Sequence, residues 1–186
     1  MKYHFTSDVH FYHNNIIKYC NRPFKSVEEM NETLIANWNK VVAPDDVIYQ
    51  LGDYGFARIE KIIPILRRLN GQKHAVYGNH DKELKRNRRI LMDEGLFLTM
   101  DKQQEMTING QYITLYHYAQ RTWNKAHHGA WQLFGHTHND LPPYGRSVDV
   151  GVDSTYITGK AEYRPFSFEE IKRFMDKQEI IGHHDR

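Results

Sequence analysis

The sequence predicts an α/β fold from two observations. In the first hundred residues, short apolar runs of strand length alternate with segments whose apolar residues recur at helical spacing. After residue 97 the pattern changes to alternating strands, and two of them flank Asn109-Gly110, a strong hairpin signal. The first pattern is typical of strand–helix–strand units and the second of antiparallel strands. With 186 residues, the chain is expected to form one domain over residues 1–186.

Strands are predicted where apolar runs end in a glycine or a polar turn: Tyr3–Ser7, Val47–Leu51, Lys73–Tyr77, Glu105–Ile108, Gln111–Leu115, Gln132–Phe134 and Ser147–Val150. Helices are predicted from Ser26 to about Val41, across residues 59–69, across residues 83–94, and from Ser167 to near Gln178. Ser26 and Glu29 have the spacing of a capping box, and Ser167 begins another. Pro64 is expected to kink or break its helix, and residues 14–24 are expected to form a loop.

Composition and charge exclude several classes of protein. The net charge of +2 is too small to support polymeric nucleic acid or a membrane surface as a partner. Cys20 is the only cysteine, so neither an intramolecular disulfide nor a cysteine-based zinc site is expected. The N-terminus lacks the apolar segment of a signal peptide, and no stretch approaches the length of a membrane span. A cytoplasmic location is therefore expected, while the oligomeric state is left open.

Histidine is unusually frequent, with 12 residues against one cysteine and three tryptophans. Several of these histidines stand with acids and an amide directly after predicted strands. Strand ends at one edge of a sheet are where α/β proteins gather their functional side chains. Oxygen and nitrogen ligands without thiolates suit two adjacent divalent cations. The candidates are Asp8, His10, Asp53, Asn79, His80, His117, His136 and His138.

The chain resembles the calcineurin-like metallophosphoesterase superfamily in five ordered blocks: Asp8-x-His10, Gly52-Asp53, Gly78-Asn79-His80-Asp81, His117 and Gly135-His136-x-His138. Residues 5–24 and 150–153 are also similar to segments of short phosphoesterases of bacteria and phages. The resemblance implies a four-layer α/β/β/α sandwich, in which two mixed β-sheets are flanked by helices.

The same resemblance implies two divalent metal ions, with manganese as the first expectation and iron, zinc or nickel also compatible. It places one ion on Asp8, His10 and His138, the other on Asn79, His117 and His136, and Asp53 between the two. Two dications and two carboxylates leave a net charge of about +2, which a phosphate anion would neutralise. A water bridging the ions would be a hydroxide near neutral pH and would attack phosphorus in line. His80 is implied as the general acid, with Asp81 orienting it.

The resemblance thus implies a metal-dependent hydrolase of phosphate esters. An open site without a capping domain favours a phosphodiester substrate, such as a small nucleotide, cyclic ones included. Two alternatives stay open: a phosphomonoesterase, including a phosphoprotein phosphatase, and a catalytically silent metal-binding interaction module. The presence of His80 beside all seven ligand positions favours an enzyme. Contacts to substrate are predicted at His13, Arg58, Arg121 and His128, although an ordinary surface role fits each of these residues equally well.

Overall fold

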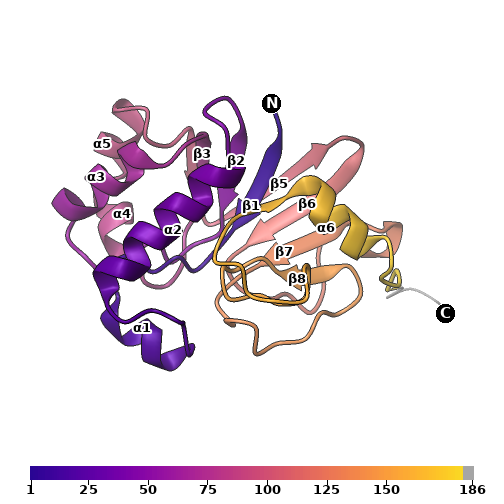
Figure 1. Cartoon of the computed structure of the whole chain (residues 1–186). Helices are drawn as coiled ribbons and strands as arrows, with labels where there is room; N and C mark the ends of the chain where they lie inside the picture. The colour runs from indigo at the N-terminus through magenta and orange to yellow at the C-terminus, as the bar shows by residue number, and fades with distance from the viewer. Residues whose placement is uncertain (182–186) are drawn as a thin grey trace.

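The computed structural model describes residues 1–181 and contains two mixed β-sheets that pack against each other, with helices on their flanks (Figure 1). This is the predicted α/β architecture. The strands are β1 (Tyr3–Thr6), β2 (Val47–Gln50), β3 (Gln72–Val76), β4 (Thr99–Asp101), β5 (Gln103–Ile108), β6 (Gln111–Tyr116), β7 (Trp131–Phe134), β8 (Ser147–Asp149) and β9 (Phe166–Ser167). The helices are α1 (Asn14–Tyr19), α2 (Val27–Val41), α3 (Ile59–Arg68), α4 (Lys82–Arg86), α5 (Arg88–Asp93) and α6 (Phe168–Met175), with a 3₁₀ helix η1 (Ala126–His128).

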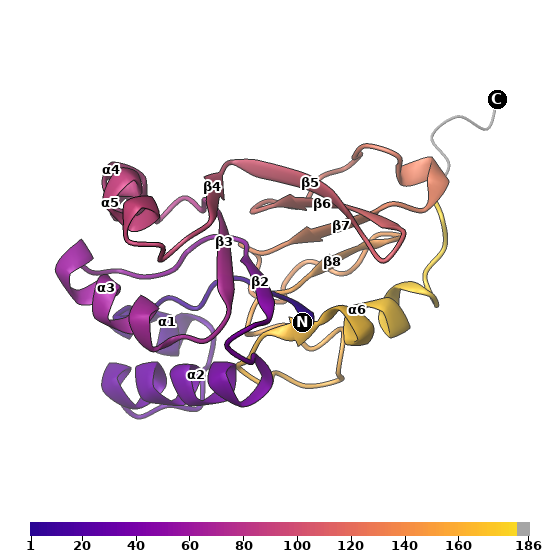
Figure 2. The same cartoon turned by 90° about the horizontal axis from the view of Figure 1, so that it is seen from above.

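The first sheet has the strand order β4-β3-β2-β1-β9, in which β9 alone is antiparallel to its neighbour. Helices α2 and α3 run along one face of this sheet (Figure 2). Their apolar residues, among them Leu34 and Trp38 of α2 and Leu66 of α3, form one core with that face. Because β1, β2 and β3 are parallel, their carboxyl ends meet at the same edge of the sheet.

The second sheet has the order β5-β6-β7-β8. Asn109 and Gly110 join β5 to β6 with φ angles of 51° and 81°, as a tight hairpin turn requires. The inner faces of the two sheets share a second core, which includes Phe5 of β1 and Leu133 of β7, and α6 adds its own apolar side chains to it. This core fixes the carboxyl ends of β6 and β7 beside those of the first sheet.

The pairing of the later strands corrects one expectation. They are not uniformly antiparallel: β4 is parallel to β3, and β6, β7 and β8 are parallel to one another. Alternation of apolar residues indicates that a segment is a strand. Whether it pairs parallel or antiparallel to its neighbour depends on the path of the segment that connects them.

Several helix boundaries also differ from expectation. Residues 14–19 form α1 within the predicted loop, and the predicted helix over residues 83–94 is divided at Asn87 into α4 and α5. Pro64 lies inside α3, which continues to Arg68 without a break. Helix α6 ends at Met175, three residues before the predicted end. Within residues 1–181, no helix is both long enough and apolar enough to cross a membrane.

Candidate metal centre

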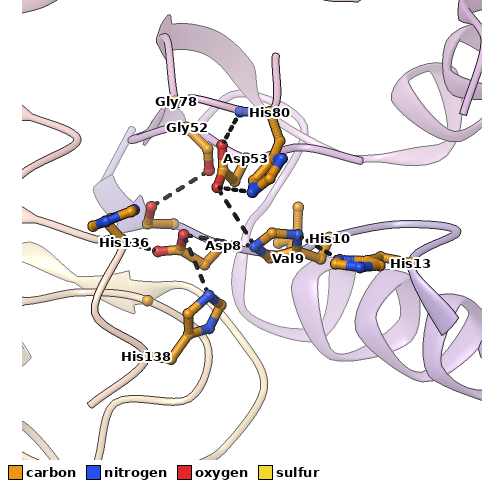
Figure 3. A network of polar contacts seen from close by, with 12 residues as sticks. Asp8, Val9, His10, His13, Gly52, Asp53, Gly78, His80, His136 and His138 are labelled. Carbon is orange, nitrogen blue, oxygen red and sulfur yellow. Dashed lines mark hydrogen bonds and ion pairs between the residues drawn. The ribbon is translucent and has the colours of Figure 1, made fainter. Parts of the chain in front are cut away.

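All eight strand-end candidates lie in one cluster where the two sheets meet. Asp8 and His10 follow β1, Asp53 follows β2, and Asn79 and His80 follow β3. The second sheet contributes His117 after β6, and His136 and His138 after β7. Figure 3 shows six of these side chains directed toward a common centre, although they come from segments far apart in the sequence.

The first ligand group consists of Asp8, His10 and His138, whose potential ligand atoms all lie within 4.8 Å of one another. Asp8 Oδ1 is 3.8 Å from His10 Nε2 and 4.0 Å from His138 Nε2. Both Asp8 Oδ1 and His10 Nε2 are buried without a hydrogen-bond partner, whereas the other oxygen of Asp8 accepts the backbone N–H of His136 over 2.8 Å. Buried polar atoms without partners are rare, so converging unpaired acceptors fit a cation.

The second group consists of Asp53, His117 and His136, again with ligand atoms within 4.8 Å of one another. Asp53 Oδ2 is 3.6 Å from His117 Nε2 and also 3.6 Å from His10 Nε2 in the first group. The other oxygen of Asp53 accepts the backbone N–H of His80 over 2.9 Å. One carboxylate oxygen therefore faces both groups, which is the position of a bridging ligand.

The hydrogen bonds of His117 determine which of its nitrogens is available. Nδ1 lies 2.7 Å from the carbonyl oxygen of Leu51, which can only accept, so the proton of the neutral ring is on Nδ1. Nε2 then carries a lone pair, and it lies 3.0 Å from Asn79 Oδ1, a second acceptor. Two acceptors at this distance repel each other unless a cation lies against both. The 3.0 Å between Nε2 of His117 and Oδ1 of Asn79 is the distance expected between two neighbouring ligand atoms that each lie about 2.1 Å from one metal ion. This pair of atoms therefore fits a metal ion.

His138 is oriented by a buried ion pair. Its Nδ1 is 2.7 Å from Asp153 Oδ2, and both oxygens of Asp153 accept from Arg22 over 2.8 Å. Arg22 also donates to the carbonyl oxygens of Asp8 and Val9, at 2.7 and 3.0 Å. Carboxylate–histidine pairs of this kind fix the tautomer of a metal ligand. Arg22 and Asp153 thus direct Nε2 of His138 toward Asp8.

Cys20 approaches the same pair from the side of α1. Its sulfur lies within 4.8 Å of ligand atoms of His138 and Asp153. Nδ1 of His138 and Asp153 are already occupied by the hydrogen bond between them. We therefore regard the Cys20 thiol as part of the wall of the centre and not as a further ligand.

Burial changes the protonation of both acid and base in the first group. It raises the pKa of Asp8 to about 7 and lowers that of His10 well below its usual value. For His138, burial by itself lowers the pKa, but the hydrogen bond to Asp153 and the charges of Asp8 and Asp153 raise it to about 11. A dication between these groups would favour the ionised acid and the unprotonated Nε2 atoms, because it replaces the protons as the counter-charge.

The ligands are held by a strained backbone. Five ligand-bearing residues have left-handed φ angles between 48° and 69°: Asp8, His10, Asp53, His136 and His138. Such conformations cost free energy for residues other than glycine and cluster at functional sites. Close packing adds a second constraint, since a Cβ atom at Gly78 would lie 2.1 Å from Asp53 Oδ1 and one at Gly135 would lie 2.3 Å from Asp8 Oδ2. The glycines of the sequence blocks are therefore needed for the ligands to approach.

His80 and Asp81, predicted as the acid and its orienting partner, have different surroundings. The His80 ring is 39% exposed, and its Nε2 lies 4.0 Å from Asp53 Oδ2. Asp81 is buried, and its oxygens accept the backbone N–H groups of Asp53, Tyr54 and Gly78 at 2.7–2.9 Å. These bonds join the loops after β2 and β3. An orienting contact with the His80 ring is not among them, so that role stays a prediction.

Only one of the four predicted substrate contacts lies at the centre. His13 Nδ1 is 3.2 Å from His10 Nδ1, and the His13 ring lines the pocket above the ligands. Arg58 precedes α3 and lines a separate cavity. Arg121 lies over the ring of Tyr144 at 4.4 Å and lines another.

His128 is also away from the centre. It belongs to η1, before the amino end of β7, whereas His136 follows the carboxyl end of that strand.

The pocket above the ligands has a volume of about 830 Å³. Sequence reasoning missed two exposed aromatic residues of the pocket wall, Tyr19 and Phe56. It also missed the orienting role of Arg22 and Asp153, although Arg22 was expected in a loop that could shape the pocket. Asp153 did carry a signal, since it ends a segment that the resemblance singled out. The aromatic residues carried none, because a single exposed ring at the end of a short helix or in a loop shows no periodicity.

Comparison with known proteins identifies the family of this chain. The family model of the calcineurin-like phosphoesterase superfamily domain matches residues 1–155. An uncharacterized protein of Methanocaldococcus jannaschii is 34% identical, over 97% of this chain and 94% of its own. A solved protein of unknown function from Aquifex aeolicus shares 25% identity with a TM-score of 0.67, over 92% of this chain and 98% of its own.

A solved archaeal phosphodiesterase shares the fold, with a TM-score of 0.50 and 19% identity over 90% of this chain and 100% of its own. The family model covers most of the chain and includes every strand-end candidate. The chain belongs to the calcineurin-like phosphoesterase superfamily.

Proposed function

We propose that this protein is a binuclear metal-dependent phosphodiesterase that acts on a small, nucleotide-like diester. The observation that carries the proposal is the position of Asp53 Oδ2, 3.6 Å from His10 Nε2 and 3.6 Å from His117 Nε2. A single carboxylate oxygen between two histidine groups suits two adjacent cations better than one. The fold shared with an archaeal phosphodiesterase supports the same class of reaction.

The two ligand groups divide the residues between the ions. Asp8, His10 and His138 would hold the first, Asn79, His117 and His136 the second, and Asp53 both. When bound, two divalent cations neutralise the oxygens of a phosphate and acidify water to supply a nucleophile. Oxygen and imidazole ligands accept manganese, iron, zinc or nickel, and manganese is the ion we would test first.

The charges of the two ions, their acidic ligands and an attacking hydroxide suit a diester. Two dications contribute four positive charges, while Asp8, Asp53 and an attacking hydroxide contribute three negative ones. A phosphodiester anion brings one more negative charge, so the sum is zero. A monoester dianion would bring a second negative charge, which the protonated His80 would have to offset, because none of the residues between 1 and 181 that line the pocket is lysine or arginine.

His80 is the residue we propose as the general acid. A water-derived oxygen would form a bond to phosphorus, the bond from phosphorus to the ester oxygen would break, and a protonated His80 would give its proton to that ester oxygen. Its exposed ring stands at the rim of the pocket, 4.0 Å from Asp53 Oδ2. A donor in this position can reach the leaving group without being a ligand itself.

The test compares hydrolysis of bis(4-nitrophenyl) phosphate and 4-nitrophenyl phosphate by chelated protein, with and without added Mn²⁺. The proposal predicts that Mn²⁺ restores turnover and that kcat/KM is higher for the diester. A higher kcat/KM for the monoester would make the protein a phosphomonoesterase. Bound metal without turnover of either ester would favour an interaction module.

A further inference from the structure

Phe56 is an exposed aromatic ring at the metal centre to which the proposed chemistry gives no role. It leaves 47% of its surface open and lines the pocket together with His13 and Tyr19. The backbone N–H of Phe56 donates to the carbonyl oxygen of Phe11 over 2.8 Å, which ties its loop to the segment after β1. An exposed phenylalanine on a fixed loop above a polar site offers an apolar surface to a bound ligand.

The ring is already part of a stack. His13 lies against it with a centroid separation of 4.0 Å and an interplanar angle of 18°. His13 is itself fixed by the 3.2 Å contact between its Nδ1 and His10 Nδ1. The two rings, named here the aromatic wall, are therefore positioned before any ligand arrives, which lowers the entropic cost of binding against them.

The aromatic wall lies on the side of the proton donor. The Phe56 ring centroid is 4.6 Å from that of His80. An ester oxygen that receives a proton from His80 would bring its attached organic group toward Phe56.

The opposite side of the centre is formed by different residues. Figure 3 shows His13 and His136 at opposite ends of the cluster. His136 is flanked by Tyr118, with ring centroids 4.7 Å apart. The group that stays on phosphorus would extend toward this end, away from the aromatic wall.

We infer that Phe56 and His13 bind a planar ring carried by the leaving group, so that the preferred leaving group is a nucleoside or a similar alcohol bearing an aromatic ring. The inference rests on the proposed phosphodiesterase function and specifies its substrate. Stacking tolerates any base because every base has a π-face, so selection among the four bases should be weak.

The experiment uses three diesters: a deoxyadenosine dinucleoside monophosphate and two analogues that lack one base or the other. The products show which nucleoside leaves. Loss of the leaving-side base should lower kcat/KM roughly tenfold, the scale of one base–aromatic contact. Loss of the base on the retained side should have little effect.

The variants separate stacking from general damage. Phe56→Leu should lower kcat/KM roughly tenfold on the complete diester and leave it unchanged on the leaving-side abasic analogue. Phe56→Tyr keeps a ring and should behave as the unmodified protein. Leu98→Ala is the matched control, since Leu98 is also 47% exposed but lies before the amino end of β4. Equal losses for Phe56→Leu on the two diesters would overturn the inference.

A binding measurement distinguishes failure of this inference from failure of the proposed function. In His80→Asn protein loaded with Mn²⁺, the dissociation constants of the complete diester and of the leaving-side abasic analogue are compared, with and without Phe56→Leu. A preference for the base that disappears with Phe56→Leu supports the aromatic wall even if no ester is hydrolysed. If the protein hydrolyses the diester but shows no preference for the base, the role of the aromatic wall is wrong while the proposed phosphodiesterase function stands.

Discussion

His138 donates its Nδ1 proton to Asp153 over 2.7 Å, and this bond leaves Nε2 as the nitrogen that faces Asp8. Burial by itself raises the pKa of Asp153, but the hydrogen bond from His138 and the charge of Arg22 lower it, so the carboxylate is ionised and accepts. A residue 15 positions further along the chain therefore sets the tautomer of a proposed metal ligand.

Replacement of this carboxylate should weaken metal binding. Asp153→Asn removes the charge that fixes His138, and we expect the affinity for Mn²⁺ at the first ligand group to fall about 10- to 100-fold. Isothermal titration of chelated protein measures the change. Asp140→Asn is the control, because Asp140 lines the same pocket, is exposed, and should leave the affinity intact. Equal affinities for Asp153→Asn and the unmodified protein would remove the orienting role.

The role of His80 can be tested without loss of the metals. His80→Gln keeps all seven ligands, so metal content should stay unchanged. The rate should fall about 10²- to 10⁴-fold for diesters with an alkyl leaving group, which needs a proton, and much less for nitrophenyl leaving groups. Comparison of kcat/KM across a series of leaving groups measures this. The same loss across the whole series would show that His80 is not the acid.

The close approach of Gly78 to Asp53 predicts the effect of one added carbon atom. In Gly78→Ala the new Cβ would lie 2.1 Å from Asp53 Oδ1 and must displace the carboxylate that faces both ligand groups. We expect loss of at least one metal ion per protein and most of the activity, measured by elemental analysis and hydrolysis. Gly95→Asn is the control, since nothing lies within 4 Å of its Cβ position and asparagine tolerates a positive φ. Retention of both ions in Gly78→Ala would contradict the prediction.

The ionised side chain of Glu170, in the first turn of α6, should contribute to the free energy of unfolding, and this contribution should be lost in acid. Burial by itself raises the pKa of Glu170, but hydrogen bonds from Arg164 and Ser167 outweigh it and lower the pKa from 4.5 to about 2. Since the folded pKa is the lower one, the contribution is complete above about pH 4.5 and is lost as the pH falls toward 2.

Glu170→Gln should therefore destabilise the protein at pH 7 by about 1–2 kcal/mol, after allowance for solvent screening, and by less at pH 3. Denaturant unfolding of both proteins across this range measures the difference. A constant difference between the two proteins would show that the ionised form of Glu170 is not responsible.

The sequence by itself indicated the candidate residues of the centre and much of the local structure. The residue types of the candidates and their positions after apolar strands follow from the printed residues, because strand periodicity and turn residues are local properties. The hairpin at Asn109-Gly110 and the helix that begins beyond Ser26 were predictable for the same reason. The division of the candidates into two groups of ligands was implied by the family resemblance.

Only the tertiary structure decided which residues meet. Arg22 and Asp153 form their ion pair across 131 positions of sequence, and Phe56 reaches His80 through the path of a loop. The same paths place His13 at the centre and leave Arg121 and His128 elsewhere. Such contacts depend on how the two sheets pack and where the connecting segments run, which no local pattern in the sequence records.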